Sequence, residues 1–195
     1  MGWYETLLES GSVTMHTSAL SEVAKRLGRA SAPETLRARP RRPEGGYSFS
    51  DSLGLGALPW HTDGAVSLRP PAFVLLAATK LHSAPVPTEL LDPSAKMIQL
   101  LKRTYLTCVA PQGRVRRFPA YLPRDGGIGV VRWDPLKCSP NVPKTNQIVG
   151  DCRPTDRIEW HQDLLLVLDN RRMLHRRPAI TEGTRELERQ YVWTD

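Results

Sequence analysis

The chain has 195 residues, of which 40% are hydrophobic and 24% charged, a composition typical of a soluble globular domain. Its longest apolar runs are too short to cross a bilayer and its first residues lack a signal-peptide pattern, so we expect one cytoplasmic domain over residues 1–195 with no membrane partner. The net charge of +7 would suit nucleic acid, but no zinc finger, RNP motif or basic helix accompanies it, and we expect no nucleic-acid partner.

The first part of the chain predicts helix, then loop, then strand. Residues 3–27 are expected to be helical, with Gly28 as the stop signal. Residues 31–46 are rich in Arg, Pro and Gly and predict a loop, so that residues 1–50 form an N-terminal helical and loop support. The apolar run at residues 73–79 predicts a buried strand.

The second part predicts one helix and several short strands. Residues 93–103 are expected to form a helix with Asp92 as its N-cap. Three further segments predict strands: 126–134, 164–168 and 188–193. Residues 135–157 are Pro-rich and polar and predict an irregular loop. Many short strands with few helices favour a mainly β fold, a sandwich or a barrel, with flanking helices.

The three cysteines, Cys108, Cys138 and Cys152, are odd in number and lack CxxC spacing. A disulfide framework usually has an even number of cysteines, and a zinc site usually has CxxC pairs. We therefore expect reduced, structural thiols.

The tripeptide His61-Thr62-Asp63 combines metal-binding residue types with a suitable spacing. On an extended segment residues i and i+2 project to the same side, so His61 and Asp63 can reach one metal ion. We pair them with His175, which lies far along the chain and must reach them by folding. Two imidazoles and one carboxylate on one face of an octahedral ion leave three positions open, the arrangement that non-heme Fe(II) oxygenases use.

A second tripeptide of the same kind, His161-Gln162-Asp163, directly precedes an apolar run. We interpret Asp163 as a turn residue at the start of that strand, so His161 is not expected to bind metal. For His16 and His82 we expect surface positions or local hydrogen bonds.

Four segments in order along the chain resemble the Fe(II)/2-oxoglutarate-dependent dioxygenases of the taurine dioxygenase and clavaminate synthase type. They are Leu-Pro-Trp-His-Thr-Asp-Gly-Ala, Arg-Pro-Pro, Pro-Thr-Glu-Leu-Leu-Asp and Val-Leu-Asp-Asn-Arg-Arg-Met-Leu-His-Arg-Arg. The last segment, which ends with His175 and two arginines, is the most specific. The resemblance covers roughly residues 55–193.

This resemblance implies a fold, a set of metal ligands and a pair of co-substrates. The fold is a distorted double-stranded β-helix, that is, a jelly-roll barrel that is mainly β with flanking helices. The iron ligands are His61, Asp63 and His175, and the co-substrates are 2-oxoglutarate and O₂. The carboxylate of Asp63 favours oxidation over halogenation, because halogenating members of the family replace it with a small residue.

The resemblance also implies residues that bind the organic ligands. Thr88 is expected to contact a carboxylate of 2-oxoglutarate. Arg189 is expected to bind the distal carboxylate, since a guanidinium offers a bidentate fork, and Arg185 is the alternative. Arg132 is a weaker candidate for an anionic group of the substrate.

The function that the resemblance implies is oxidation, foremost hydroxylation, of a small metabolite such as an amino acid or a specialised-metabolism intermediate, with release of succinate and CO₂. Desaturation or cyclisation at the same site, and a catalytically retired barrel that acts as a binding protein, stay open as alternatives. The chain is short for this family, and residues 135–157 are the obvious candidate lid loop. A substrate linked to a carrier or peptide, or a second subunit that caps the pocket in a homo-oligomer, are further options.

Several residues near these positions are expected to be structural. Asp169 and Asn170 should shape the turn before His175, and Trp133 should pack in the core. Arg176 and Arg177 are expected to be solvated.

Overall fold

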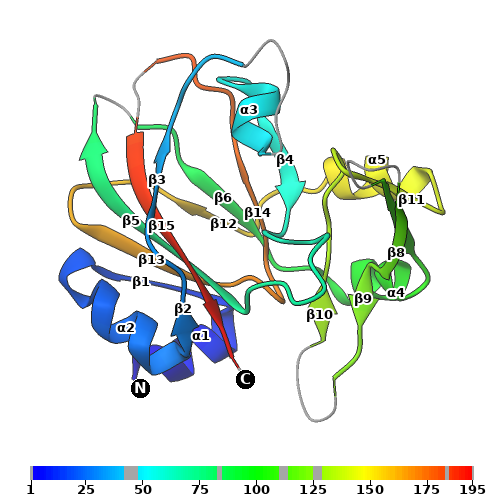
Figure 1. The fold of residues 1–195 in the computed structure, drawn as a ribbon, viewed down its shortest axis with the longest axis horizontal. Helices are drawn as coiled ribbons and strands as arrows, with labels where there is room; N and C mark the ends of the chain where they lie inside the picture. The colour runs from blue at the N-terminus through cyan, green and yellow to red at the C-terminus, as the bar shows by residue number, and fades with distance from the viewer. Residues whose placement is uncertain are drawn as a thin grey trace.

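The chain folds into two antiparallel sheets that face each other, with a few short helices around them (Figure 1). No helix in the described part of the chain is long and apolar enough to span a membrane. The computed structural model describes residues 2–41, 48–82, 85–109, 114–124, 129–182 and 185–194.

The larger sheet forms one wall of the core. Its strands are β1 (Ser12–His16), β2 (Arg29–Ala30), β3 (Glu34–Arg37), β5 (Phe73–Leu81), β13 (Leu164–Asp169) and β15 (Arg185–Trp193). Their order is β1–β13–β5–β15–β2, and β3 also pairs with β15. The strands expected at residues 73–79, 164–168 and 188–193 are confirmed as β5, β13 and most of β15.

The central strands of this sheet are apolar on both faces because both faces are covered. Leu75 and Val167 belong to a core cluster with the N-terminal helices, whereas Leu76 and Leu166 belong to a cluster with the opposite sheet. Figure 1 shows these helices below the sheet. Their bounds are α1 (Trp3–Ser10), the 3₁₀-helix η1 (Thr17–Ala19) and α2 (Leu20–Leu27).

The second sheet forms the opposite wall and carries most of the polar residues discussed below. Its strands are β4 (Leu58–His61), β6 (Thr88–Leu91), β12 (Asp156–Ile158) and β14 (Leu174–Arg177). Their order is β12–β6–β14–β4. In the register of this sheet His175 lies opposite His61 on one side and opposite Leu90 on the other. Two histidines that are distant in sequence thus become neighbours.

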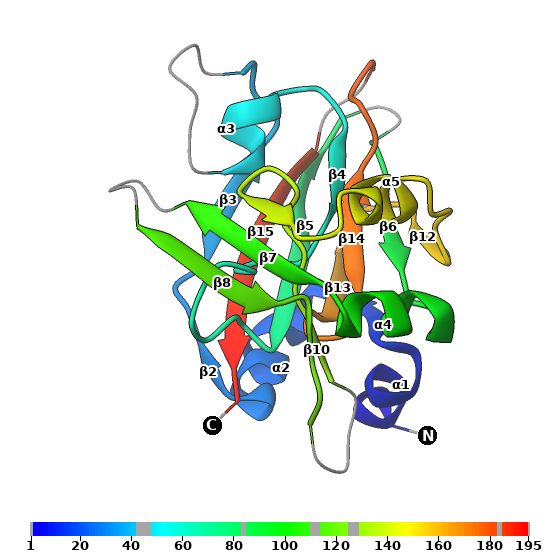
Figure 2. The same cartoon turned by 90° about the vertical axis from the view of Figure 1, so that its right-hand side faces the viewer.

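A third part of the fold packs beside the second sheet and has its own core cluster (Figure 2). It contains β7 (Tyr105–Val109), β8 (Val115–Pro119), β9 (Tyr121–Leu122), β10 (Val130–Val131), β11 (Cys138–Pro140), α4 (Ala95–Lys102) and α5 (Lys144–Gly150). The strands form a sheet of order β11–β7–β8 and a separate pair, β10–β9.

The expectation that all three cysteines are reduced is wrong for two of them. Cys108 on β7 and Cys138 on β11 lie opposite each other and form a disulfide, while Cys152 is free. The register of two strands brings the pair together, and neither cysteine lies in a recognisable spacing motif. Sequence arithmetic alone therefore does not reveal this bond.

The expectation that residues 3–27 form one helix is wrong. Gly11 ends α1 in a left-handed conformation, with φ of 79°, and the next five residues form β1, which pairs with β13 along its whole length. Pairing with the edge of the large sheet has overridden local helix propensity. The end of α2 at Gly28 is confirmed.

The helix expected at residues 93–103 is confirmed as α4, but it begins later. Its N-cap is Ser94, whose hydroxyl accepts a hydrogen bond from the backbone N–H of Met97, so the expectation that Asp92 is the N-cap is wrong. The carboxylate of Asp92 instead pairs with Arg172.

Two segments expected to be loops contain regular structure. Residues 135–157 hold β11, α5 and the start of β12, and residues 31–46 hold β3. Residues 42–46 lie outside the described residues, as do 126–128 of the strand expected at 126–134, where the structure has the short strand β10.

Candidate active site

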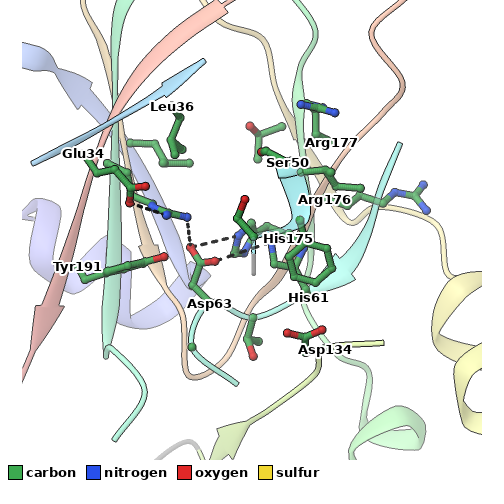
Figure 3. A pocket seen from close by; sticks show the side chains of 18 of the residues that line it. Glu34, Leu36, Ser50, His61, Asp63, Asp134, His175, Arg176, Arg177 and Tyr191 are labelled. Carbon is green, nitrogen blue, oxygen red and sulfur yellow. Dashed lines mark hydrogen bonds and ion pairs between the residues drawn. The ribbon is translucent and has the colours of Figure 1, made fainter. Parts of the chain in front are cut away.

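The structure brings His61, Asp63 and His175 together in one cluster between the two sheets (Figure 3). Their ligand atoms all lie within 4.8 Å of one another. Nε2 of His61 is 3.9 Å from Oδ1 of Asp63, and Nε2 of His175 is 3.8 Å from Oδ2 of Asp63. Two imidazole nitrogens and a carboxylate therefore converge on one point, as a metal ion on an N₂O face requires.

Local structure sets the direction of each ligand in the first pair. His61 is the last residue of β4, and its Nδ1 lies 2.8 Å from the carbonyl oxygen of Pro59, which leaves Nε2 toward Asp63. Thr62 turns the other way, where its hydroxyl accepts a hydrogen bond from the backbone N–H of Trp133 at 3.1 Å. The alternation expected for an extended segment thus places His61 and Asp63 on the same side.

Asn170 fastens Asp63 to the loop that precedes β14. Its side-chain oxygen accepts from the backbone N–H of Asp63 at 2.8 Å, and its nitrogen donates to the carbonyls of Asp63 at 3.0 Å and Pro71 at 2.9 Å. All three bonds are buried. The structural role expected of Asn170 is confirmed, and it extends directly to a metal-ligand candidate.

Burial and charge set the protonation states of the three groups. Burial, together with the neighbouring His61, lowers the pKa of His175 to about 3, and burial also lowers the pKa of His61. Burial alone would raise the pKa of Asp63, but the cation of Arg189 is the main group that outweighs it, with support from a hydrogen bond of Tyr191, so the pKa of this carboxyl lies below its ordinary value. Neutral imidazoles and an ionised carboxylate are the forms that bind a metal ion.

A cavity of about 550 Å³ opens above the cluster. Its walls come from both sheets, and it is lined by Leu76, Arg189 and Tyr191 on one side and by Thr88 and Arg177 on the other. This volume falls in the range of small-molecule sites in proteins.

Thr88 is buried and lines this cavity. Its hydroxyl oxygen accepts a hydrogen bond from Nε1 of Trp160 at 3.1 Å. A hydroxyl is both donor and acceptor, so its hydrogen stays available for a carboxylate in the cavity.

The two arginines that the sequence offered as carboxylate ligands stand in different surroundings. Arg189 has two carboxylate partners: Nη1 is 3.4 Å from Oδ2 of Asp63, and Nη2 is 2.7 Å from Oε2 of Glu34. Arg185 has no carboxylate partner among the described residues. It donates to the carbonyl of Val86 and lies over the ring of Trp160, the residue that donates to Thr88.

The structure places Arg132 away from the cavity walls. Its guanidinium donates to the carbonyls of Ala65, Ser67 and Leu68, the last two at 2.5 and 3.3 Å, and lies over the ring of Phe118. These contacts hold the turn that follows Asp63.

The expectation that Arg176 and Arg177 are solvated is wrong. Arg176 pairs with Glu89 at 2.5 Å and lies over the ring of Trp60, and Arg177 is buried. Strand β14 has one face on the cavity, so alternate residues must point inward. By contrast, the core position of Trp133 is confirmed.

The remaining histidines behave as the sequence indicated. His161 is exposed, and Asp163 has a positive φ of 64°, as a turn residue can. His16 accepts a local hydrogen bond from the backbone of Ser18, and His82 is exposed. None of the three lines the cavity.

Sequence reasoning missed three residues at the site. The ring of Phe49, in α3 (Phe49–Leu53), lies against the ring of His61 with 4.2 Å between centroids. Glu34 pairs with Arg189, and Figure 3 shows the hydroxyl end of Tyr191 directed at Asp63. None of them lies in a motif, and only the pairing of β3 with β15 brings Glu34 to the site.

The same fold occurs in solved oxygenase structures of low sequence identity. A taurine dioxygenase from Burkholderia xenovorans matches with 14% identity and a TM-score of 0.71 over 98% of this chain and 80% of that chain. An asparagine oxygenase in complex with Fe(II), 2S,3S-3-hydroxyasparagine and succinate matches with 18% identity and a TM-score of 0.71 over 95% of this chain and 75% of that chain. PvcB from Pseudomonas aeruginosa matches with 14% identity and a TM-score of 0.65 over 97% and 78%.

Comparison with protein-family models and with curated proteins gives no match. At these identities the structural likeness establishes a shared fold, the fold of taurine dioxygenase.

Proposed function

We propose that this protein is an Fe(II)- and 2-oxoglutarate-dependent oxygenase. One observation carries the proposal: His61, Asp63 and His175 place their ligand atoms within 4.8 Å of one another, in a fold that solved enzymes of this kind share. The facing sheets fit the distorted double-stranded β-helix of such enzymes. Because both imidazoles are held neutral and the carboxyl is ionised, the donor set suits Fe(II).

In this proposal the three metal-ligand candidates have a defined role. His61, Asp63 and His175 would hold one face of the ion and leave three positions open. Bound Fe(II) supplies the chemistry that couples decarboxylation of 2-oxoglutarate, to succinate and CO₂, with oxidation of the substrate by O₂. Burial of the three ligand side chains would limit the access of bulk water to the metal ion.

We assign the distal carboxylate of 2-oxoglutarate to Thr88 and Arg185. Leu90 lies opposite His175, and Thr88 is two residues farther along the same strand, a step of about 6.6 Å. That step is comparable to the reach of a five-carbon acid chelated through its keto-acid end. Arg185 is joined to Thr88 through Trp160 and lacks a carboxylate partner in the described structure.

Arg189, the first choice from the sequence, is the alternative for this role. It lies level with the metal ligands, since it contacts Asp63 directly, and it would have to leave Asp63 and Glu34 to reach a distal carboxylate. The geometry therefore favours Arg185, and the Kd of 2-oxoglutarate for Arg185→Ala and for Arg189→Ala decides between them.

For the reaction itself we propose hydroxylation of a small metabolite such as an amino acid or a specialised-metabolism intermediate. The cavity volume of about 550 Å³ supports a substrate of that size. Desaturation or cyclisation would use the same residues. The non-catalytic alternative is a retired barrel that only binds a ligand. The convergence of the three metal-ligand candidates argues against it.

Turnover of 2-oxoglutarate tests the proposal. We expect the purified protein with Fe(II), ascorbate and air to release succinate from 2-oxoglutarate, slowly alone and faster when a screen supplies a substrate. His175→Ala should abolish the release. If the wild-type protein binds Fe(II) and 2-oxoglutarate but forms no succinate with any compound of the screen, the binding-protein alternative replaces the enzyme.

A further inference from the structure

Arg177 is a buried cation that has no anionic partner in the part of the chain that the structure describes. Its side chain is in the core, with 7% of its surface exposed, and it lines the cavity. Nη2 donates to the carbonyls of Gly54 at 2.7 Å and Gly56 at 2.6 Å, while the buried Nε has no hydrogen-bond partner. No carboxylate of the described residues pairs with it. A buried charge in this state is costly unless something else neutralises it.

Arg177 is a neighbour of Thr88, the residue that we assign to the distal carboxylate of 2-oxoglutarate. The register places Arg176 opposite Glu89, so the next residue, Arg177, lies beside Thr88. Figure 3 shows Arg177 and His175 on the same strand, with Arg176 pointing away from the metal ligands. Arg177 therefore extends the cavity wall from His175 toward Thr88.

A second arginine, Arg185, also lacks a carboxylate partner among the described residues. Burial and, to a lesser extent, the charge of Arg177 lower the pKa of Arg185 to about 9, so the two cations act on each other. Two like charges in a dry environment repel each other strongly. Arg177 and Thr88 line the cavity, and Arg185 is linked to Thr88 through the ring of Trp160. Neither arginine has a carboxylate partner among the described residues, so this end of the cavity carries uncompensated positive charge.

We infer that Arg177 is a second cationic anchor for the distal carboxylate of 2-oxoglutarate, acting with Arg185 and Thr88. This inference rests on the proposed function and deepens it. It assigns to Arg177 a role beyond holding the turn at Gly54 and Gly56, and it explains why a buried arginine keeps part of its guanidinium unpaired. A carboxylate between the two arginines would relieve their repulsion and satisfy the free donors.

The test compares two co-substrates that differ only in the distal group. The protein, loaded anaerobically with Fe(II), is titrated with 2-oxoglutarate and with 2-oxopentanoate, which has the same chain length but ends in a methyl group. Binding is followed by the visible charge-transfer band of the iron–keto-acid complex. We expect Arg177→Met to raise the Kd of 2-oxoglutarate by about 10- to 100-fold, as loss of a charge-assisted hydrogen bond does, and to leave the Kd of 2-oxopentanoate within about twofold.

Two further variants sharpen the comparison. Arg157→Met removes an exposed arginine of the same sheet, which pairs with Glu159 at 2.5 Å outside the cavity, and it should change neither Kd. Arg177→Lys keeps a cation and is the variant to use if Arg177→Met does not fold. Because a lysine lacks the fork, we expect an increase in the Kd of 2-oxoglutarate that is smaller than for methionine but still selective over 2-oxopentanoate.

The outcomes separate the inference from the function on which it rests. Equal weakening of both acids would show that Arg177 only supports the fold, and unchanged binding of 2-oxoglutarate would exclude a contact; either result overturns the anchor alone. If the wild-type protein binds Fe(II) but neither acid, the proposed function and the anchor both fall.

Discussion

Asp63 is the residue on which the electrostatics of the site depend. Its carboxylate faces both histidines and accepts a hydrogen bond from Arg189 at 3.4 Å. The charge of Arg189 is the main reason that it stays ionised despite its burial. The sequence could predict that His61 and Asp63 point the same way, because alternation along a strand is local. It could not predict Arg189 beside them, because that contact joins two sheets.

At the residue scale, acid should destabilise the metal-free protein through His175. Folded His175 stays neutral down to its pKa of about 3, whereas the unfolded chain takes up the proton near the ordinary value of 6.5. Between these two values protonation favours the unfolded state, so stability falls as pH falls. We expect the urea midpoint to be lower at about pH 5.5 than at about pH 7.5, and His175→Gln to reduce that difference. An equal difference in both proteins would contradict the assignment.

The choice between the two arginines of β15 is also decided at this scale. Arg185→Ala should weaken 2-oxoglutarate binding by about 10- to 100-fold, because it leaves the distal carboxylate without its bidentate partner. Arg189→Ala should have the smaller effect on that Kd, since Arg189 is neutralised by Asp63 and Glu34. Calorimetric titration of the Mn(II)-loaded protein measures both values. The reverse order would restore Arg189, the sequence-based choice.

At the scale of elements, the site depends on how the end of β4 is joined to the start of β14. Two buried hydrogen bonds of Asn170 tie the backbone of Asp63 to the loop that leads to His175, and a third reaches the carbonyl of Pro71. The sequence identified both segments and expected a structural turn, because turn residues have local signatures. That the turn fastens the other segment follows only from the tertiary fold.

We expect Asn170→Ala to lower the affinity for Fe(II) or Mn(II) by about 10- to 100-fold, the usual effect of losing support behind a metal ligand. The matched control is Asn141→Ala, which removes a single 2.7 Å bond to the backbone of Tyr105, outside the cavity. Metal titration and thermal unfolding are measured on both variants. If both variants lose the same stability and neither changes in metal affinity, the hydrogen bonds of Asn170 support only the fold and not the metal site.

The disulfide between Cys108 on β7 and Cys138 on β11 should stabilise the fold. A bond between residues 30 apart in sequence restricts the unfolded chain, a contribution of about 3–4 kcal/mol in the chain-entropy picture. Cys108→Ser should therefore lower the urea midpoint in non-reducing buffer, and Cys152→Ser should not. Thiol titration of the unfolded, non-reduced protein should find one free cysteine per chain. Three free thiols would contradict the disulfide.

At the scale of the whole molecule, the sequence predicted strongly patterned elements well and irregular ones poorly. The strands at β5 and β13 were evident because residues 73–78 and 164–168 are all buried and all apolar. Strand β1 was missed since its residues become a strand only by pairing with β13. In the segment 135–157, β11 and α5 lie beside the second sheet and the start of β12 belongs to that sheet, and Lys137 is the one residue of the segment on the cavity wall. Its role as a lid therefore has little support in the described structure.

Anaerobic titration with Fe(II) and then 2-oxoglutarate tests the central claim most directly, because the weak visible charge-transfer band requires both groups on one site. We predict that the band forms with the wild-type protein and is absent from His175→Ala. With iron bound, absence of the band from the wild-type protein would contradict the account, as would a band of equal strength in the variant.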